Sequence, residues 1–114
     1  MDVIFSGFSK DAHPMAMLTT SVAALSGSYH QGIDIRDKLH QKDFFFNILG
    51  KVPILVASVF NHNRKDALVE YDESLSYSEN ILRLFFGWQE GYETDPILSK
   101  ALDILLILHA DHEQ

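Results

Sequence analysis

The hydrophobic positions along the chain recur at helical rather than strand spacing, and they divide it into four main helical segments. The first segment runs from about Pro14 to His30, with proline at a favourable first helical position. Its apolar residues recur at steps of three and four, which predicts one shared face: Met15, Leu18, Val22, Leu25 and Tyr29. A short helical piece ending near Ser9 is predicted before it.

The second segment, from about Lys42 to His62, is apolar almost all round. A helix with so little polar surface is typical of the interior of a larger packed body. Gly50 and Pro53 interrupt the pattern, and proline lacks a backbone donor and clashes with the preceding turn, so a kink or break is predicted there. The β-branched residues after Pro53 leave a buried strand as the alternative.

Two shorter helices complete the pattern. Ser76 and Glu79 form an S-x-x-E capping box at the start of the third, and Gly87 is predicted to end it in a left-handed conformation. Asp95 and Pro96 open the last helix as N-cap and first helical residue. No alternating pattern competes, so we predict an all-α fold with residues 1–114 forming a single region.

The amino-acid composition limits which classes of partner the protein can bind. The 114 residues include 46% hydrophobic and 22% charged positions, which fits one globular domain, and the net charge of −7 argues against a nucleic-acid surface. The chain has no cysteine, which excludes a disulfide framework, a thiolate zinc site and a catalytic thiol. The apolar stretch from Ile104 to Leu108 is far shorter than the roughly 20 residues that span a bilayer. We therefore expect no membrane partner, and no targeting segment is evident.

The densest set of ionisable groups closes the chain. His109 and His112 are three residues apart, so on a continuing helix they would lie on one face, within reach of one anionic ligand. The competing interpretation is a frayed polar end, where histidine complements the helix dipole. No metal site is predicted, because Asp111 and Glu113 add oxygen ligands but neither H-E-x-x-H nor a di-iron-type Glu-x-x-His is present.

Five motifs in order along the chain resemble citrate synthase, and the bacterial-type enzymes most closely. They are His13-Pro14-Met15, Gly50-Lys51-Val52-Pro53, Leu75 to Asn80 followed by Phe86-Gly87, Asp95 to Leu98, and Leu106 to Gln114. The resemblance implies an acyltransferase of the citric acid cycle, which condenses acetyl-CoA with oxaloacetate and water to give citrate and CoA. It also implies an almost wholly helical enzyme with a large and a small domain, assembled as a homodimer or homohexamer in the bacterial cytoplasm.

The same resemblance assigns roles to residues. His112 corresponds to a histidine that binds oxaloacetate, and His109 lies beside it in the motif, so both are predicted substrate-binding residues. The family's two catalytic histidines and its catalytic aspartate belong to later motifs that do not occur here. We therefore predict that residues 1–114 are part of the large domain, without the small domain or the catalytic part, and are inactive alone. Acetyl-CoA enters as a substrate, and no cofactor is implied.

Two further points stay open at this stage. Tyr29 and Lys51 align with the NADH-inhibition site of bacterial hexameric members, but Asn47 stands where an arginine is expected, which argues against NADH regulation. The rival functions are a 2-methylcitrate synthase segment, which would act on propionyl-CoA, and a non-catalytic helical interaction module.

Overall fold

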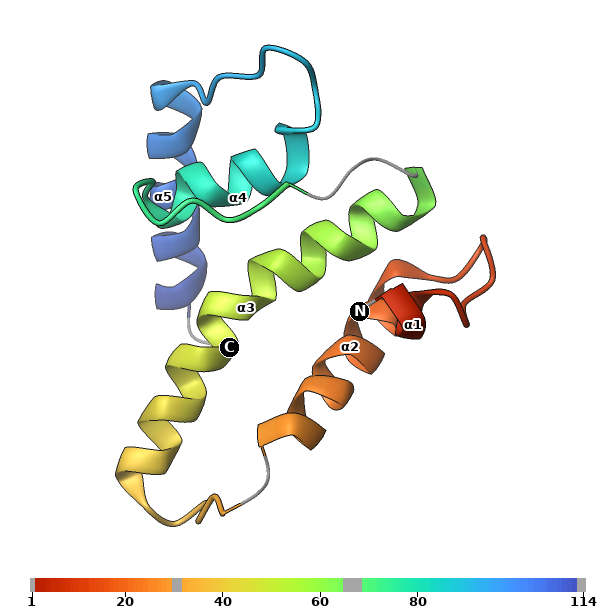
Figure 1. Cartoon of the computed structure of the whole chain (residues 1–114). Helices are drawn as coiled ribbons and strands as arrows, with labels where there is room; N and C mark the ends of the chain where they lie inside the picture. Colours follow the sequence, from red (N-terminus) through yellow and green to blue (C-terminus); the bar gives the residue numbers. More distant parts are fainter. Residues whose placement is uncertain (1, 30–31, 65–68, 113–114) are drawn as a thin grey trace. The chain divides into compact units, whose positions relative to one another are not determined.

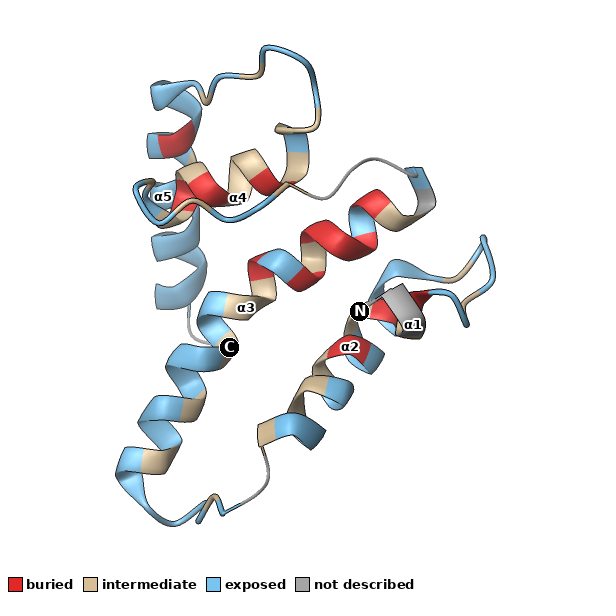
Figure 2. Cartoon of the chain, viewed as in Figure 1, coloured by how far each residue is buried: buried red, intermediate tan, exposed pale blue. Residues whose placement is uncertain are grey.

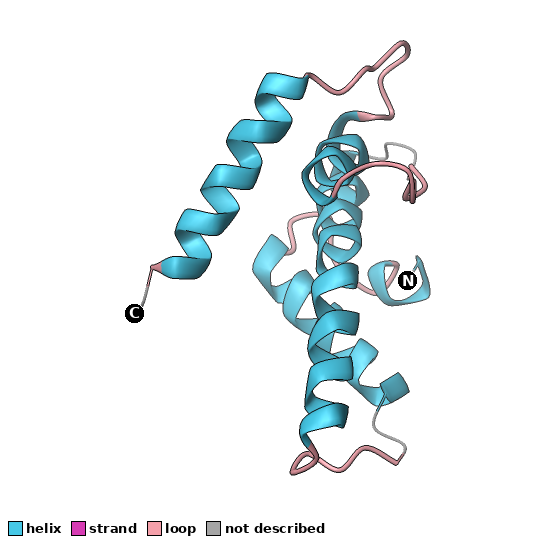
Figure 3. Ribbon diagram, turned by 90° about the vertical axis from the view of Figure 1, so that its left-hand side faces the viewer, coloured by secondary structure: helices cyan, strands magenta, loops and turns pink. Residues whose placement is uncertain are grey.

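The computed structural model describes residues 2–29, 32–64 and 69–112, and the described part is helical with connecting loops and no strand (Figure 3). The predicted all-α fold is therefore confirmed. The chain divides into two compact units, Met1–Asp66 and Ala67–Gln114. Three helices belong to the first unit and two to the second (Figure 1).

The first unit contains α1 (Asp2–Phe5), α2 (Pro14–Tyr29) and α3 (Lys38–Arg64). Helix α1 ends at Phe5, earlier than the predicted Ser9, because the chain turns there and the Phe8 amide donates to the Phe5 carbonyl at 3.0 Å. Helix α2 begins at Pro14 as predicted. Its first turn is capped by His13, whose Nδ1 accepts from the Met15 amide at 3.2 Å.

The core of this unit lies where α1, α2 and α3 meet. Phe5, Met17 and Val59 form a buried cluster, with Met17 fully excluded from solvent. Helices α2 and α3 contact each other directly. Two small polar residues are also buried, and their hydroxyls are satisfied within their own helices: Ser21 donates to the Met17 carbonyl, and Ser58 donates to the Ile54 carbonyl. A hydroxyl bonded in this way is buried without the desolvation cost of a free one.

Helix α3 passes through Pro53 without interruption, so the predicted alternatives of a break or a buried strand are wrong. The ribbon changes direction near its middle, which agrees with a bend (Figure 1). A proline removes one helical hydrogen bond and pushes the preceding turn aside, and a long helix absorbs this by bending. Burial falls mainly on the C-terminal half of α3, while most of its first half is exposed (Figure 2).

Within the described residues, one segment, Lys38–His62, is long and apolar enough to cross a bilayer by length and composition alone. The core helix of a water-soluble protein meets the same criterion. The segment overlaps α3 and carries Leu55 and Val59, which are buried within the first unit.

The second unit contains α4 (Tyr77–Phe86) and α5 (Pro96–Asp111), which contact each other. The predicted capping box is confirmed: the Ser76 side chain accepts from the Glu79 amide, and the Glu79 carboxylate accepts from the Ser76 amide at 2.8 Å. The buried Ser78 hydroxyl donates to Asp103, which links α4 to α5. Leu84 supplies buried apolar surface in this unit.

Gly87 ends α4, but its predicted left-handed conformation is wrong, since its φ is −66° and its ψ is −6°. Glycine is needed at this position because there is no room for a side chain. A Cβ at this position would lie 2.5 Å from the Arg83 carbonyl oxygen, and the Gly87 amide donates to that same oxygen at 2.7 Å. The close approach of the two backbone segments therefore requires a residue without a side chain.

Candidate functional site

Helix α5 carries the two predicted site histidines at its carboxyl end. The helix starts as predicted, with the Asp95 carboxylate accepting from the Ile97 amide at 2.8 Å and Pro96 in its first turn. His109 lies in its last turn, and His112 is the C-cap residue, where ψ changes to 89° and the helix ends. Both side chains are exposed.

The ring of His109 is held by a hydrogen bond to its own helix. Its Nδ1 lies 2.9 Å from the carbonyl oxygen of Leu105, one turn earlier. The structure therefore has two exposed imidazoles at one helix end, one of them with a fixed ring, and an imidazole N–H can donate a hydrogen bond to an anion.

The helix that leads to these histidines exposes most of its apolar surface. Ser99 is its one buried residue, and Figure 2 shows the rest of α5 almost entirely exposed. The large apolar side chains that face solvent on α5 are Ile97, Leu98, Ile104, Leu105, Leu106, Ile107 and Leu108. An apolar surface of this extent on a helix marks a place where other protein surface packs.

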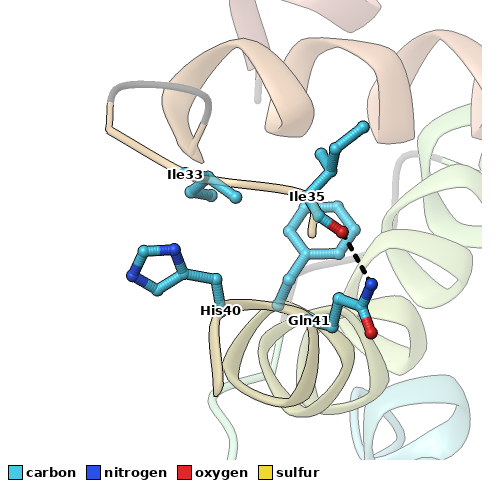
Figure 4. Close-up of a pocket in the computed structure, with 5 residues that line it drawn as sticks. Ile33, Ile35, His40 and Gln41 are labelled. Carbon is cyan, nitrogen blue, oxygen red and sulfur yellow. Dashed lines mark hydrogen bonds between the residues drawn. The ribbon is translucent and has the colours of Figure 1, made fainter. Parts of the chain in front are cut away.

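A pocket that was not predicted from the sequence lies in the first unit. Residues at the start of α3 and in the loop before it line a pocket of about 150 Å³: Ile33, Ile35, His40, Gln41 and Phe44 (Figure 4). Gln41 Nε2 donates to the Ile35 carbonyl at 2.6 Å, and His40 Nδ1 accepts from the Asp34 amide at 3.1 Å. No local motif predicts such a pocket, because it depends on how the loop folds onto the helix.

The structure brings together Tyr29 and Lys51, which only the resemblance links to an NADH-inhibition site. The Lys51 ammonium lies 4.2 Å above the centre of the Tyr29 ring, in a cation–π contact. Asn47, one turn before Lys51, donates through its side chain to the Asp43 carbonyl at 2.9 Å. The absence of NADH regulation stays a prediction.

Hydrogen bonding shifts two carboxyl groups in the second unit. The Ser76 hydroxyl and backbone lower the pKa of Glu79, and the Ser74 hydroxyl and backbone lower the pKa of Asp72. Burial raises the pKa of Tyr77. These groups hold the loop and first turn of α4 and lie outside the last turn of α5. In the part of the chain that the structure describes, no group of three or more metal-binding side chains is close enough to hold an ion.

The described part of the chain is an all-helical protein segment with two exposed histidines at the carboxyl end of α5. Comparison with known proteins narrows this class. The family model described as "Citrate synthase, C-terminal domain" matches residues 1–114. The citrate synthase of Corynebacterium glutamicum is 47% identical over 112 residues, a match that covers 96% of this chain and 25% of that protein.

This chain belongs to the citrate synthase family. It spans about a quarter of the length of the curated relative that it matches. The predicted family is confirmed, while the roles of His109 and His112 stay predictions.

Proposed function

We propose that this chain is a helical segment of an acyltransferase that condenses acetyl-CoA with oxaloacetate and water to citrate and CoA. The observation that carries the proposal is the 47% identity to a citrate synthase across nearly the whole chain. In this proposal the catalytic groups come from residues outside positions 1–114, so residues 1–114 do not catalyse the reaction alone.

The part of the site supplied here is the carboxyl end of α5. Oxaloacetate is a dicarboxylate, and an imidazole N–H that donates to a carboxylate makes a charge-assisted hydrogen bond. His112 is placed where the helix ends and its side chain is exposed, so a substrate can reach it. We assign His112 to direct contact with oxaloacetate and place His109 beside it. The arginines that neutralise the second carboxylate would come from elsewhere in the enzyme.

The exposed apolar faces of α3 and α5 support an assembled enzyme. Ile97 is 78% exposed, Leu39 is 70% exposed and Ile107 is 67% exposed. Such exposure of grouped large apolar side chains is unusual on the surface of a complete protein. In this proposal they are covered by the remainder of the large domain and by a second subunit of a homodimer or homohexamer. The bacterial relative supports a cytoplasmic location for the enzyme in this proposal.

The test is the acyl-CoA dependence of the complete protein. CoA release is followed with oxaloacetate and either acetyl-CoA or propionyl-CoA, and we expect a higher kcat/KM with acetyl-CoA. A preference for propionyl-CoA would favour a 2-methylcitrate synthase, and no CoA release with either thioester would favour a non-catalytic helical module. His112→Ala should raise the KM for oxaloacetate about tenfold or more, because one charge-assisted hydrogen bond is lost. His40→Ala, in the other compact unit, is the matched control and should leave that KM unchanged.

A further inference from the structure

Among the residues that the structure describes, three histidines have a ring nitrogen in a defined hydrogen bond with the backbone, and the bonds are of two kinds. His13 Nδ1 lies 3.2 Å from the Met15 amide nitrogen, and His40 Nδ1 lies 3.1 Å from the Asp34 amide nitrogen. His109 Nδ1 lies 2.9 Å from the Leu105 carbonyl oxygen. A backbone amide only donates and a carbonyl oxygen only accepts, so the partner fixes where the ring proton is.

The two kinds of bond require opposite tautomers. Nδ1 of His13 and of His40 must be unprotonated to accept, so the neutral rings carry their proton on Nε2. Nδ1 of His109 must be protonated to donate to Leu105. A neutral His109 ring therefore has a lone pair on Nε2, and that nitrogen accepts a hydrogen bond and cannot donate one.

We propose that His109 is a positioning residue, held as the Nδ1–H tautomer by the Leu105 carbonyl, whose Nε2 accepts a hydrogen bond from a donor of the enzyme or a bound water. This inference rests on the proposed function. Every oxygen of oxaloacetate in its keto dianion form is a hydrogen-bond acceptor. A neutral His109 ring has its one N–H bonded to the Leu105 carbonyl, so it has no donor left for oxaloacetate. The donor that contacts the substrate is then His112, and His109 orders the group or water that its Nε2 binds. The sequence alone predicts the same role for both histidines, and the Leu105 bond separates them.

The tautomer is measured directly by ¹⁵N NMR of the complete protein labelled at histidine. Spectra are recorded at about pH 8.5, where an imidazole with an ordinary pKa is neutral. Protonated and unprotonated ring nitrogens resonate far apart, and His→Gln variants assign each signal. We expect protonated Nδ1 and unprotonated Nε2 for His109, and the reverse for His13 and His40, which are internal controls. An Nε2–H signal for neutral His109 overturns the proposal.

Kinetics at the same pH test the division of roles. His112→Ala should raise the KM for oxaloacetate about tenfold or more, whereas His109→Ala should raise it by less than about threefold, since a direct charge-assisted bond is lost only in the first. His109→Asn places an amide donor near the position of Nδ1, so it can retain the Leu105 bond if His109→Ala weakens the helix end. Equal increases in KM for His109→Asn and His112→Ala overturn the proposal.

The proposed function and the positioning role of His109 are refuted by different results. If the wild-type protein shows no oxaloacetate-dependent CoA release, the proposed function is wrong, whatever the tautomer of His109. If the enzyme is active and His109 behaves as a direct ligand, the proposed function stands and the positioning role is wrong.

Discussion

The side chain of Asn80 ties the loop before α4 to the first turn of that helix, and its removal should release the loop. Asn80 is fully buried. Its Oδ1 accepts from the Asp72 amide at 2.9 Å, and its Nδ2 donates to the Asp72 carbonyl at 2.8 Å. The carbonyls of Leu75 and Ser76, each at 3.2 Å, share the remaining donor capacity of Nδ2.

The expected effect of Asn80→Ala follows from the number of hydrogen bonds that the Asn80 side chain makes. Nδ2 has two hydrogens, so at most three full hydrogen bonds form at once: one accepted by Oδ1 and two donated by Nδ2. Each is worth about 1 kcal/mol net, which gives a loss of about 2–3 kcal/mol in the free energy of opening the loop. Opening should therefore become about 30- to 150-fold more frequent.

The assay is hydrogen–deuterium exchange of the complete protein, because exchange reports local opening even where global unfolding is irreversible. The Asp72 amide, which Asn80 protects, should exchange about 30- to 150-fold faster in Asn80→Ala. Asn80→Asp is the matched variant, since it keeps an acceptor for the Asp72 amide but loses the Nδ2 donor that faces three carbonyls. It should expose the loop at least as much as Asn80→Ala. Wild-type protection of the Asp72 amide in either variant would refute the reasoning.

Four further outcomes are expected. Met17→Ala should lower the stability of the first unit by about 2–5 kcal/mol in denaturant unfolding, because the side chain is fully buried in its core; a loss below about 1 kcal/mol would contradict this packing. Gly87→Ala should cost about 1–3 kcal/mol, since its Cβ would meet the Arg83 carbonyl, and Gly87→Ala with wild-type stability would show that the backbone yields freely. The pKa of Glu79 is lowered in the fold, so its stabilising effect is fully present above the usual value of 4.5 and is lost as the pH falls through the lowered value. The difference in thermal midpoint between wild type and Glu79→Gln should therefore shrink on acidification, and a difference independent of pH would contradict the capping role. The isolated 114-residue polypeptide should self-associate and bind a hydrophobic dye, and a monodisperse monomer with a cooperative transition would oppose an apolar docking surface on α3 and α5.

The elements that the sequence predicts well are those determined by neighbours along the chain. The Ser76–Glu79 capping box and the start of α5 at Asp95 depend on residues within one turn of each other, and both are present as predicted. The all-helical class follows from the same local periodicity. These features need no knowledge of tertiary packing.

The features that the sequence does not predict depend on how parts of the chain are arranged in three dimensions. Gly87 has ordinary right-handed angles, and the need for glycine arises from the Arg83 carbonyl, which the pattern does not show. Helix α3 continues through Pro53 because the hydrogen-bonded turns on both sides stabilise the helix by more than one missing hydrogen bond costs. The pocket beside His40 needs a loop to fold back on α3.

The candidate site was predicted in part. The spacing of His109 and His112 places both at the end of the last helix, and the structure has them there. The sequence does not show that the Leu105 carbonyl holds the His109 ring, because any helical position has a carbonyl one turn earlier and only the ring orientation decides. Their role in substrate binding stays a prediction, which rests on the resemblance to the family.

The most direct test of the central claim is the affinity of the complete protein for oxaloacetate, measured by isothermal titration calorimetry. We predict one site per subunit in the wild type, a Kd about tenfold or more higher in His112→Ala, and an unchanged Kd in the control His40→Ala. Equal oxaloacetate affinity in the wild type and His112→Ala would contradict the claim that the end of α5 forms part of the substrate site.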